Sequence, residues 1–224
     1  MNKSVNILLF ILFIPTALLA VVVGFDLPIG FLRLTGESLP YAQEIFYVLA
    51  GLFFILGGRR AVQRWSGMKM VADTKRYLWN EPMDQKRVQR VSMYLALEGW
   101  FHLVFALMLY LVTPLFWPVA VVFIIFGLDH FIFSRIGKKK KLFRIGITKN
   151  AVVFADREVK VAYFTGLRRI SIQQQSIYFD YIKDLQISAS IDGISSEDRK
   201  LFRETIENSV DRNVVFFSEG FKEL

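Results

Sequence analysis

Four ionisable side chains lie inside apolar segments of the sequence, where burying a charge is costly. They are Glu98, His102, Asp129 and His130, and they include both histidines of the chain. Ionisable groups at such positions are rare and often mark a function. Glu98 and His102 are spaced i, i+4, so they share one face of a helix. These four residues form a candidate intramembrane polar cluster.

Three kinds of chemistry fit this polar cluster. The carboxylates and imidazoles could satisfy one another and hold two helices together. They could instead relay a proton or an ion, because His and carboxylate groups titrate near neutral pH when their surroundings shift them. Two His and two carboxylates could also bind Zn, Fe or Mn, although Glu-x-x-x-His followed by Asp-His matches no di-iron or zinc-protease spacing. We favour the first and predict no cofactor, with a metal ion at the cluster as an alternative.

The elements that must position this cluster are long apolar segments. Apolar residues make up 54% of the 224 residues, 22 of them Phe, and the mean hydropathy is +0.38. A helix needs about 20 apolar residues to cross a bilayer. Four segments meet this length closely enough, at residues 5–25, 41–58, 93–112 and 115–133. The sequence predicts an antiparallel bundle of four transmembrane helices in region 1–134, the first retained rather than cleaved and kinked at Pro15.

The charges of the connecting loops predict the orientation of this bundle. The loop 59–91 carries nine cations against three acids, and 135–141 carries five cations and no acid. The loop 26–40 has only Arg33 against Asp26 and Glu37. Because basic loops stay in the cytoplasm, we expect both termini to be cytoplasmic. The cations expected to contact anionic lipid headgroups are Arg59, Arg60, Arg64, Lys138, Lys139, Lys140 and Lys141.

The same charges predict the depth of the two carboxylates. Counted from Arg90 and Arg135, Glu98 and Asp129 lie about 12 and 9 Å along their helices. In antiparallel neighbours, this places the two carboxylates within one helical turn of each other. The loop 59–91 also interleaves its cations with aromatic residues, which favours an interfacial helix at 59–72. Docking of this segment on the C-terminal domain is the alternative.

After the basic junction 135–141, residues 142–224 change to short alternating segments typical of strands. Six strands are expected, at 142–148, 151–154, 159–164, 167–173, 176–181 and 185–191. Ser195 and Asp198 then form an approximate capping box for a helix over 196–209. The apolar face of that helix is predicted from Leu201, Phe202, Thr205, Ile206 and Val210. This order predicts a small α+β domain, an antiparallel meander or partly open barrel closed by one helix.

Two segments of this domain carry a resemblance to a known family. The segment FRIGITKNAVVFADREVKVAYFTGLRRISI resembles the opening hairpins of bacterial pleckstrin-homology-like (PH-like) domains attached to small multi-helix membrane proteins, and IDGISSEDRKLFRETIENSV resembles their final strand and closing helix. The resemblance covers about 80 residues and contains no diagnostic motif. It implies a bacterial inner membrane for this chain, and a lipid- or peptide-binding fold that serves scaffolding more often than catalysis.

The charge of the domain excludes some classes of function. Residues 142–224 contain twelve cations and twelve acids, so the positive excess lies at the membrane junction and nucleic-acid binding is not expected. A basic patch at Arg157, Lys160, Arg168 and Arg169 could be a binding site, but a solvated strand edge is the favoured interpretation. The chain has no Cys, and Ser171 and Ser176 have no histidine in their domain, so we predict no catalytic residues.

We therefore expect a noncatalytic membrane scaffold or accessory subunit of a larger membrane complex, in which the PH-like domain binds a protein partner. The alternative is an ion-coupled or metal-dependent membrane protein that acts through the polar cluster. Whether the chain is an enzyme stays open at this stage.

Overall fold

The computed structural model describes residues 2–30, 34–182, 185–211 and 213–224. Four residues that entered the charge counts, Arg33, Lys183, Asp184 and Arg212, lie outside these ranges. By its internal contacts the chain divides into two compact units. The helical unit comprises Met1–Val62 and Tyr94–Phe133, and the sheet unit comprises Gln63–Met93 and Ser134–Leu224.

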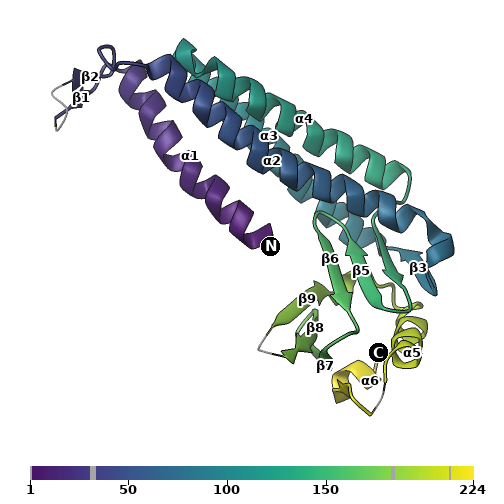
Figure 1. The fold of residues 1–224 in the computed structure, drawn as a ribbon. Coiled ribbons are helices and arrows are strands. Elements are labelled where there is room, and N and C mark those ends of the chain that lie inside the picture. The colour runs from purple at the N-terminus through teal and green to yellow at the C-terminus, as the bar shows by residue number, and fades with distance from the viewer. Residues whose placement is uncertain (1, 31–33, 183–184, 212) are drawn as a thin grey trace. The chain divides into compact units, whose positions relative to one another are not determined.

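Four long helices carry the apolar segments. Helix α1 spans Asn2–Gly24, α2 Ala42–Ala72, α3 Gln85–Val112 and α4 Trp117–Lys139 (Figure 1). Each is long and apolar enough to cross a membrane, which confirms the prediction of four apolar helices. Helix α2 continues without a break to Ala72, beyond the expected end of its apolar segment at 58. Between α1 and α2, the strands β1 (Pro28–Ile29) and β2 (Leu34–Thr35) pair as a short antiparallel ribbon.

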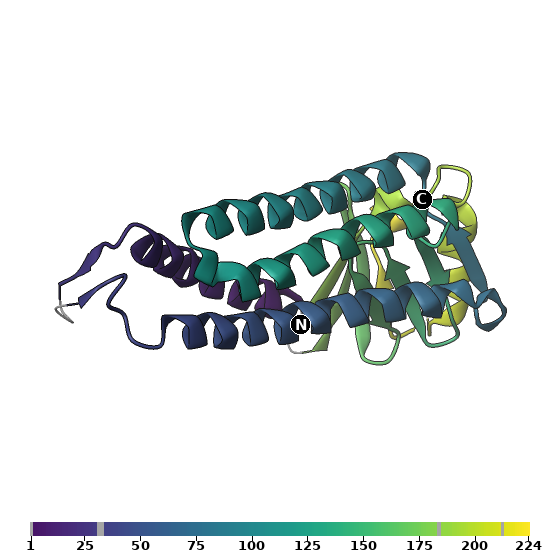
Figure 2. The same cartoon turned by 90° about the horizontal axis from the view of Figure 1, so that it is seen from above.

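Aromatic side chains fill the core of the helical unit, where α2, α3 and α4 run side by side (Figure 2). Phe123 of α4 lies against Phe53 of α2 with ring centroids 5.0 Å apart, and against Phe13 of α1 at 6.1 Å. Half of the apolar window of α4 is buried, against 22% or less in the other three helices. Helix α4 is therefore the packing centre of this unit, and the other helices leave most of their apolar surface uncovered.

Two four-stranded sheets form the sheet unit. The first has the order β3-β4-β5-β6, all antiparallel, with β3 at Trp79–Pro82, β4 at Arg144–Ile147, β5 at Ala151–Ala155 and β6 at Val159–Tyr163. The second has the order β10-β7-β8-β9, with β7 at Leu167–Gln173, β8 at Ser176–Tyr181, β9 at Gln186–Ser190 and β10 at Phe216–Phe217. Six of these strands are the six predicted ones; β3 and β10 were not predicted.

The described strands form two sheets and no closed barrel, so the expected antiparallel meander is present but divided between the two sheets. Strand β3 occupies the free edge of β4, and β10 pairs in parallel with β7. Both strands fill edges that the meander would have had to pair in order to close. The two sheets contact each other where Lys160 Nζ of β6 donates a hydrogen bond of 2.8 Å to Ser188 O of β9, and where the rings of Phe154 on β5 and Phe179 on β8 lie 6.1 Å apart.

The C-terminal helices cover the core of the sheet unit. Helix α5 spans Arg199–Ser209 and α6 spans Glu219–Lys222. The predicted helix begins three residues later than expected, at Arg199, and its N-cap Asp198 makes no side-chain cap bond. The Ser195 hydroxyl donates to Asp198 at 2.6 Å and accepts from the Asp198 N–H at 3.2 Å, within the turn that precedes the helix. Of the predicted apolar face, Phe202 and Ile206 are buried, Leu201 is 53% exposed, and Val210 follows the last residue of the helix.

The segment between α2 and α3 is part of the sheet unit. Trp79 of β3 is 6% exposed and packs edge-on against Phe202, with ring centroids 5.3 Å apart. Val71 of α2 is buried against Val153 and Ala155 of β5. A Cβ at Gly67 would lie 1.8 Å from a Val159 methyl carbon, so only glycine permits this approach of α2 to β6. This segment therefore packs on the domain, which was the second of the two sequence-based alternatives.

Candidate functional site

Glu98 is the centre of the polar cluster in the helical unit. Its Oε2 accepts a hydrogen bond of 3.0 Å from Arg60 Nη2 on α2 and lies 2.9 Å from His130 Nε2 on α4. The side chains are 26%, 17% and 5% exposed, respectively. One carboxylate oxygen of α3 thus joins three helices at a single point.

The environment of His130 requires an additional proton in this cluster. Its Nδ1 lies 2.5 Å from the carbonyl oxygen of Phe126, which can only accept, so Nδ1 carries a hydrogen. The 2.9 Å contact between Nε2 and Glu98 then needs a second hydrogen, either on Nε2 or on the Glu98 carboxyl. Arg60 donates to the same oxygen, so this proton lies between His130 and Glu98 beside an arginine.

Two glycines bring α3 and α4 together beside these side chains. A Cβ built on Gly99 would lie 3.1 Å from the carbonyl oxygen of Gly127, and a Cβ built on Gly127 would lie 3.1 Å from that of Gly99. Both distances are too short for an unstrained contact. Small residues at a helix crossing allow the close backbone approach that membrane helices use for packing. The glycines therefore allow Glu98 and His130 to reach each other across the interface.

The other two residues of the predicted cluster, His102 and Asp129, lie beside His130. His102 donates from Nδ1 to its own helix at Glu98 O, 2.7 Å away, and its ring stacks on that of His130 with centroids 5.2 Å apart. Asp129 is half-buried next to His130 in the sequence. Because Asp129 precedes His130 in α4, the contact of His130 with Glu98 places the carboxylates of Glu98 and Asp129 at a similar depth, as predicted. Among the described residues, no group of three or more His, Cys, Asp or Glu is arranged to hold a metal ion.

Sequence reasoning missed the role of Arg60. We expected this side chain at the membrane surface, but it is half-buried and bonded to Glu98. The available signal was its place in α2, directly after the apolar run that ends in Gly57 and Gly58. Of the other predicted surface cations, Arg64 is only 3% exposed, and Arg59 and the lysines at 138–141 are exposed.

The candidate basic patch of the domain is divided between two sheet edges. Lys160 bonds to Ser188 on β9, whereas the Arg169 guanidinium lies 5.5 Å from the centroid of the Phe216 ring on β10. Strands β9 and β10 are the opposite edges of one four-stranded sheet. Arg157 lies in the β5–β6 turn, and Arg168 is next to Arg169 on β7. The interactions at Lys160 and Arg169 therefore lie about three strand spacings apart, roughly 14 Å.

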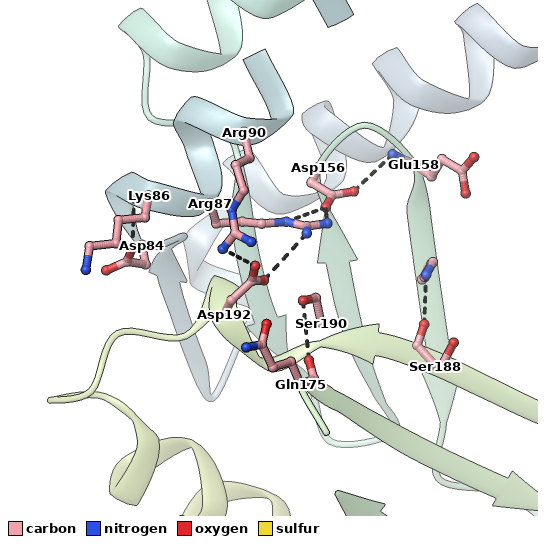
Figure 3. Close-up of polar contacts among 11 residues, drawn as sticks. Asp84, Lys86, Arg87, Arg90, Asp156, Glu158, Gln175, Ser188, Ser190 and Asp192 are labelled. Carbon is pink, nitrogen blue, oxygen red and sulfur yellow. Dashed lines mark hydrogen bonds and ion pairs between the residues drawn. The ribbon is translucent and has the colours of Figure 1, made fainter. Parts of the chain in front are cut away.

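A second group of charges fastens the first turns of α3 within the sheet unit (Figure 3). Arg87 donates to Asp156 at the end of β5, with 2.5 Å from Nη2 and 3.2 Å from Nε. Its Nη1 lies 3.5 Å from Asp192, which also pairs with Arg90. The Asp84 N–H donates to Gly193 O at 3.0 Å. Arg87 thus connects α3 to the turn after β5 and to the segment after β9.

A groove with apolar side chains opens on the sheet unit. Its volume is about 550 Å³, and it lies between the β6–β7 turn, the end of β8 and the segment after α5. Ile182 and Val214 line it and are 52% and 61% exposed. Among the described lining residues, Lys149 and Arg168 are the cations and Asp211 is the acid. Tyr181, at the end of β8, donates from its hydroxyl to Tyr163 O at 2.7 Å, and burial raises the pKa of Tyr181 to about 12.

Fold and site define a chain with four apolar helices of membrane-spanning length and a C-terminal sheet domain. Comparisons with protein-family models, with curated proteins and with solved structures find no match. Function therefore has to be inferred from the contacts of the chain itself.

Proposed function

We propose that this chain is a noncatalytic multi-pass protein of a bacterial inner membrane that serves as a scaffold or accessory subunit of a larger membrane complex. Its N- and C-termini face the cytoplasm, and its PH-like sheet domain binds a protein partner. The order of six antiparallel strands followed by α5 supports the PH-like fold. The basic ends of the helices, including Lys138 and Lys139 in the last turn of α4, support the cytoplasmic placement.

The single observation that carries the proposed partner binding is the groove on the sheet domain. Large apolar side chains are costly to leave in water, and a clustered set of them marks an interaction surface. Ile182 and Val214 provide such a set, beside the partly buried Phe164. Because Lys149 and Arg168 outnumber Asp211 at this groove, we expect the partner segment to combine apolar side chains with at least one carboxylate.

The helical unit supports a noncatalytic role. Glu98 uses one oxygen to bind both Arg60 and His130, so its carboxylate and the Arg60 guanidinium are paired within the bundle. Pairing of this kind holds helices together.

The test is affinity purification of the full chain in mild detergent, followed by native mass spectrometry. The wild type is expected to retain one defined partner, and the double variant I182D/V214D is expected to lose it. The matched control is L201D, because Leu201 is 53% exposed on α5 and does not line the groove. A wild-type protein that runs alone contradicts the proposal, and so does equal retention in both variants.

A second candidate function is a proton relay through the polar cluster. The observation in its favour is the continuous contact from Glu98 through His130 to the stacked ring of His102. Substitution of both histidines by Ala distinguishes the two candidates. The relay requires loss of proton-coupled activity with intact folding and partner retention, whereas the scaffold account predicts reduced stability as the primary effect.

A further inference from the structure

A separate cavity lies where α3 begins and α4 ends, within the sheet unit. Its volume is about 480 Å³. This size lies within the range of small-molecule sites, which is about 300 to 1,000 Å³. The first two turns of α3 form one wall, and the last turn of α4 and the start of the following chain form another.

The floor of this cavity is apolar and rigid. Met83 and Phe143 line it and are 7% and 1% exposed. A Cβ on Gly137 would lie 2.5 Å from the Phe143 ring, so the glycine lets this ring pack directly beneath α4. The Met83 N–H donates to Phe143 O at 2.9 Å and fixes the two sides of the floor to each other.

The polar lining of the cavity favours an anion. Lys138 and Lys141 supply two ammonium groups, and Gln85 and Gln89 supply amide donors. None of the nine described residues that line the cavity carries a carboxylate. Gln85 is also the first residue of the 28-residue helix α3, where the Lys86 N–H already donates to the Asp84 carboxylate at 2.8 Å. The two ammonium groups and the two amides are therefore the groups that attract phosphate oxygens.

Lys141 has a left-handed backbone conformation that is unfavourable for lysine. Its φ is +51°, a conformation that L-residues other than Asn and Asp seldom adopt and that glycine usually provides at the end of a helix. The Leu142 N–H donates to Gly137 O at 2.9 Å, which closes this helix end. A lysine at this position brings a charge to the cavity wall that glycine could not supply.

The location of the cavity indicates the source of the anion. Lys138 follows Phe133, the last residue of the predicted fourth span, by five residues, or about 7.5 Å of helix rise. In the membrane placement proposed above, on which this inference rests, that distance corresponds to the headgroup layer of the cytoplasmic leaflet. The apolar floor with Val88 can accept the glycerol and first acyl carbons beside the phosphate.

We propose that this cavity is a specific site for the phosphate headgroup of one anionic phospholipid of the cytoplasmic leaflet. Such a site differs from diffuse attraction of lipid by the basic junction, because it depends on two of the four consecutive lysines. Lys138 and Lys141 line the cavity, and Lys139 and Lys140 do not. This division of one basic run provides a matched control of equal charge.

The test uses the full chain in nanodiscs of phosphatidylcholine with a minor fraction of phosphatidylglycerol, and native mass spectrometry of the lipid retained after release. The wild type is expected to retain one phosphatidylglycerol. K138Q/K141Q is expected to reduce this retention at least tenfold, and K139Q/K140Q to leave it within twofold. A third variant, Q89W, fills the cavity from an exposed position and should also remove the bound lipid without changing the charge.

Equal losses in the two lysine variants would overturn the proposal, because they would show diffuse attraction only. Retention by Q89W would also overturn it. Displacement of the lipid by millimolar glycerol phosphate would show that the site takes a free phosphate ester rather than a lipid. The outcome is distinguishable from that of the proposed function, since partner retention is measured with the groove variants I182D/V214D.

Discussion

His130 on α4 and Glu98 on α3 share one contact of 2.9 Å between Nε2 and Oε2, and Arg60 on α2 binds the same carboxylate oxygen. Three helices therefore depend on one side chain. In membrane proteins, single interhelical hydrogen bonds contribute about 0.6 kcal/mol on average and up to about 1.7. Removal of Glu98 also leaves an arginine and a histidine without their shared partner.

We predict that Glu98→Ala lowers the free energy of unfolding by about 1 to 3 kcal/mol. The measurement is a titration with sodium dodecyl sulfate in mixed micelles, followed by tryptophan fluorescence. Glu44→Ala is the control, because Glu44 is an exposed acid in the first turn of α2. Equal stability of E98A and E44A would show that the cluster does not hold the helices together.

The close crossing of α3 and α4 gives a second prediction. Gly127→Ala forces a Cβ to within 3.0 Å of Leu103 and 3.1 Å of Gly99 O, so we expect a loss of about 1 to 3 kcal/mol from overpacking. Gly51→Ala, which meets nothing within 4 Å on α2, should be neutral or slightly stabilising. The same titration checks both variants. If G127A were as stable as G51A, the two helices would have to cross less closely.

The charges around Arg87 give a third prediction. Arg87→Ala leaves Asp156, whose side chain is 13% exposed, without this partner, and Asp192 keeps only Arg90 of the pair. We expect a loss of about 1 to 3 kcal/mol, below the value for a fully buried pair because Arg87 is 25% exposed. Hydrogen exchange should increase at residues 155–158 and 190–194.

Arg76→Ala is the control, because this side chain is 81% exposed and pairs with Asp73 three residues away. Its effect on the free energy of unfolding should stay below about 1 kcal/mol. Similar effects of the two substitutions would contradict the proposed role of Arg87.

Strand β3 gives a fourth prediction. Trp79→Ala removes a buried ring from its contact with Phe202 and should cost about 3 to 5 kcal/mol. Amide exchange should then rise in β4 and α5, the elements that Trp79 joins. The neighbouring Leu78→Ala is the control, because Leu78 is 55% exposed. Unchanged protection of α5 in W79A would mean that β3 is not part of this core.

Local patterns in the sequence predicted most of the elements but few of their contacts. The four helices follow from apolar length, and the strands β4 to β9 follow from alternation between turn residues. Strand β3 could not be predicted in this way, because a four-residue edge strand inside a basic loop has too little periodicity and pairs with β4 more than 60 residues later. The division into two sheets could not be predicted for the same reason, since β3 and β10 fill sheet edges only through long-range pairing.

Local sequence patterns also did not predict every member of the polar cluster. Glu98, His102 and His130 stand out because ionisable residues are rare in apolar helices. Arg60 does not, because an arginine at the end of an apolar run usually marks the membrane surface. Its inclusion depends on the crossing of α2 with α3, which brings together two residues 38 positions apart in the sequence. The contact with Glu98 is therefore a tertiary property that helix periodicity cannot supply.

Partner binding at the groove is the central claim, and site-specific photo-crosslinking in living cells tests it most directly. A photoreactive amino acid would be placed singly at Val214, at Ile182 and at the control position Leu201, all of which are exposed. The account predicts one discrete crosslinked partner from Val214 and Ile182 and none from Leu201. Absence of a crosslink at both groove positions, or the same product from Leu201, would contradict it.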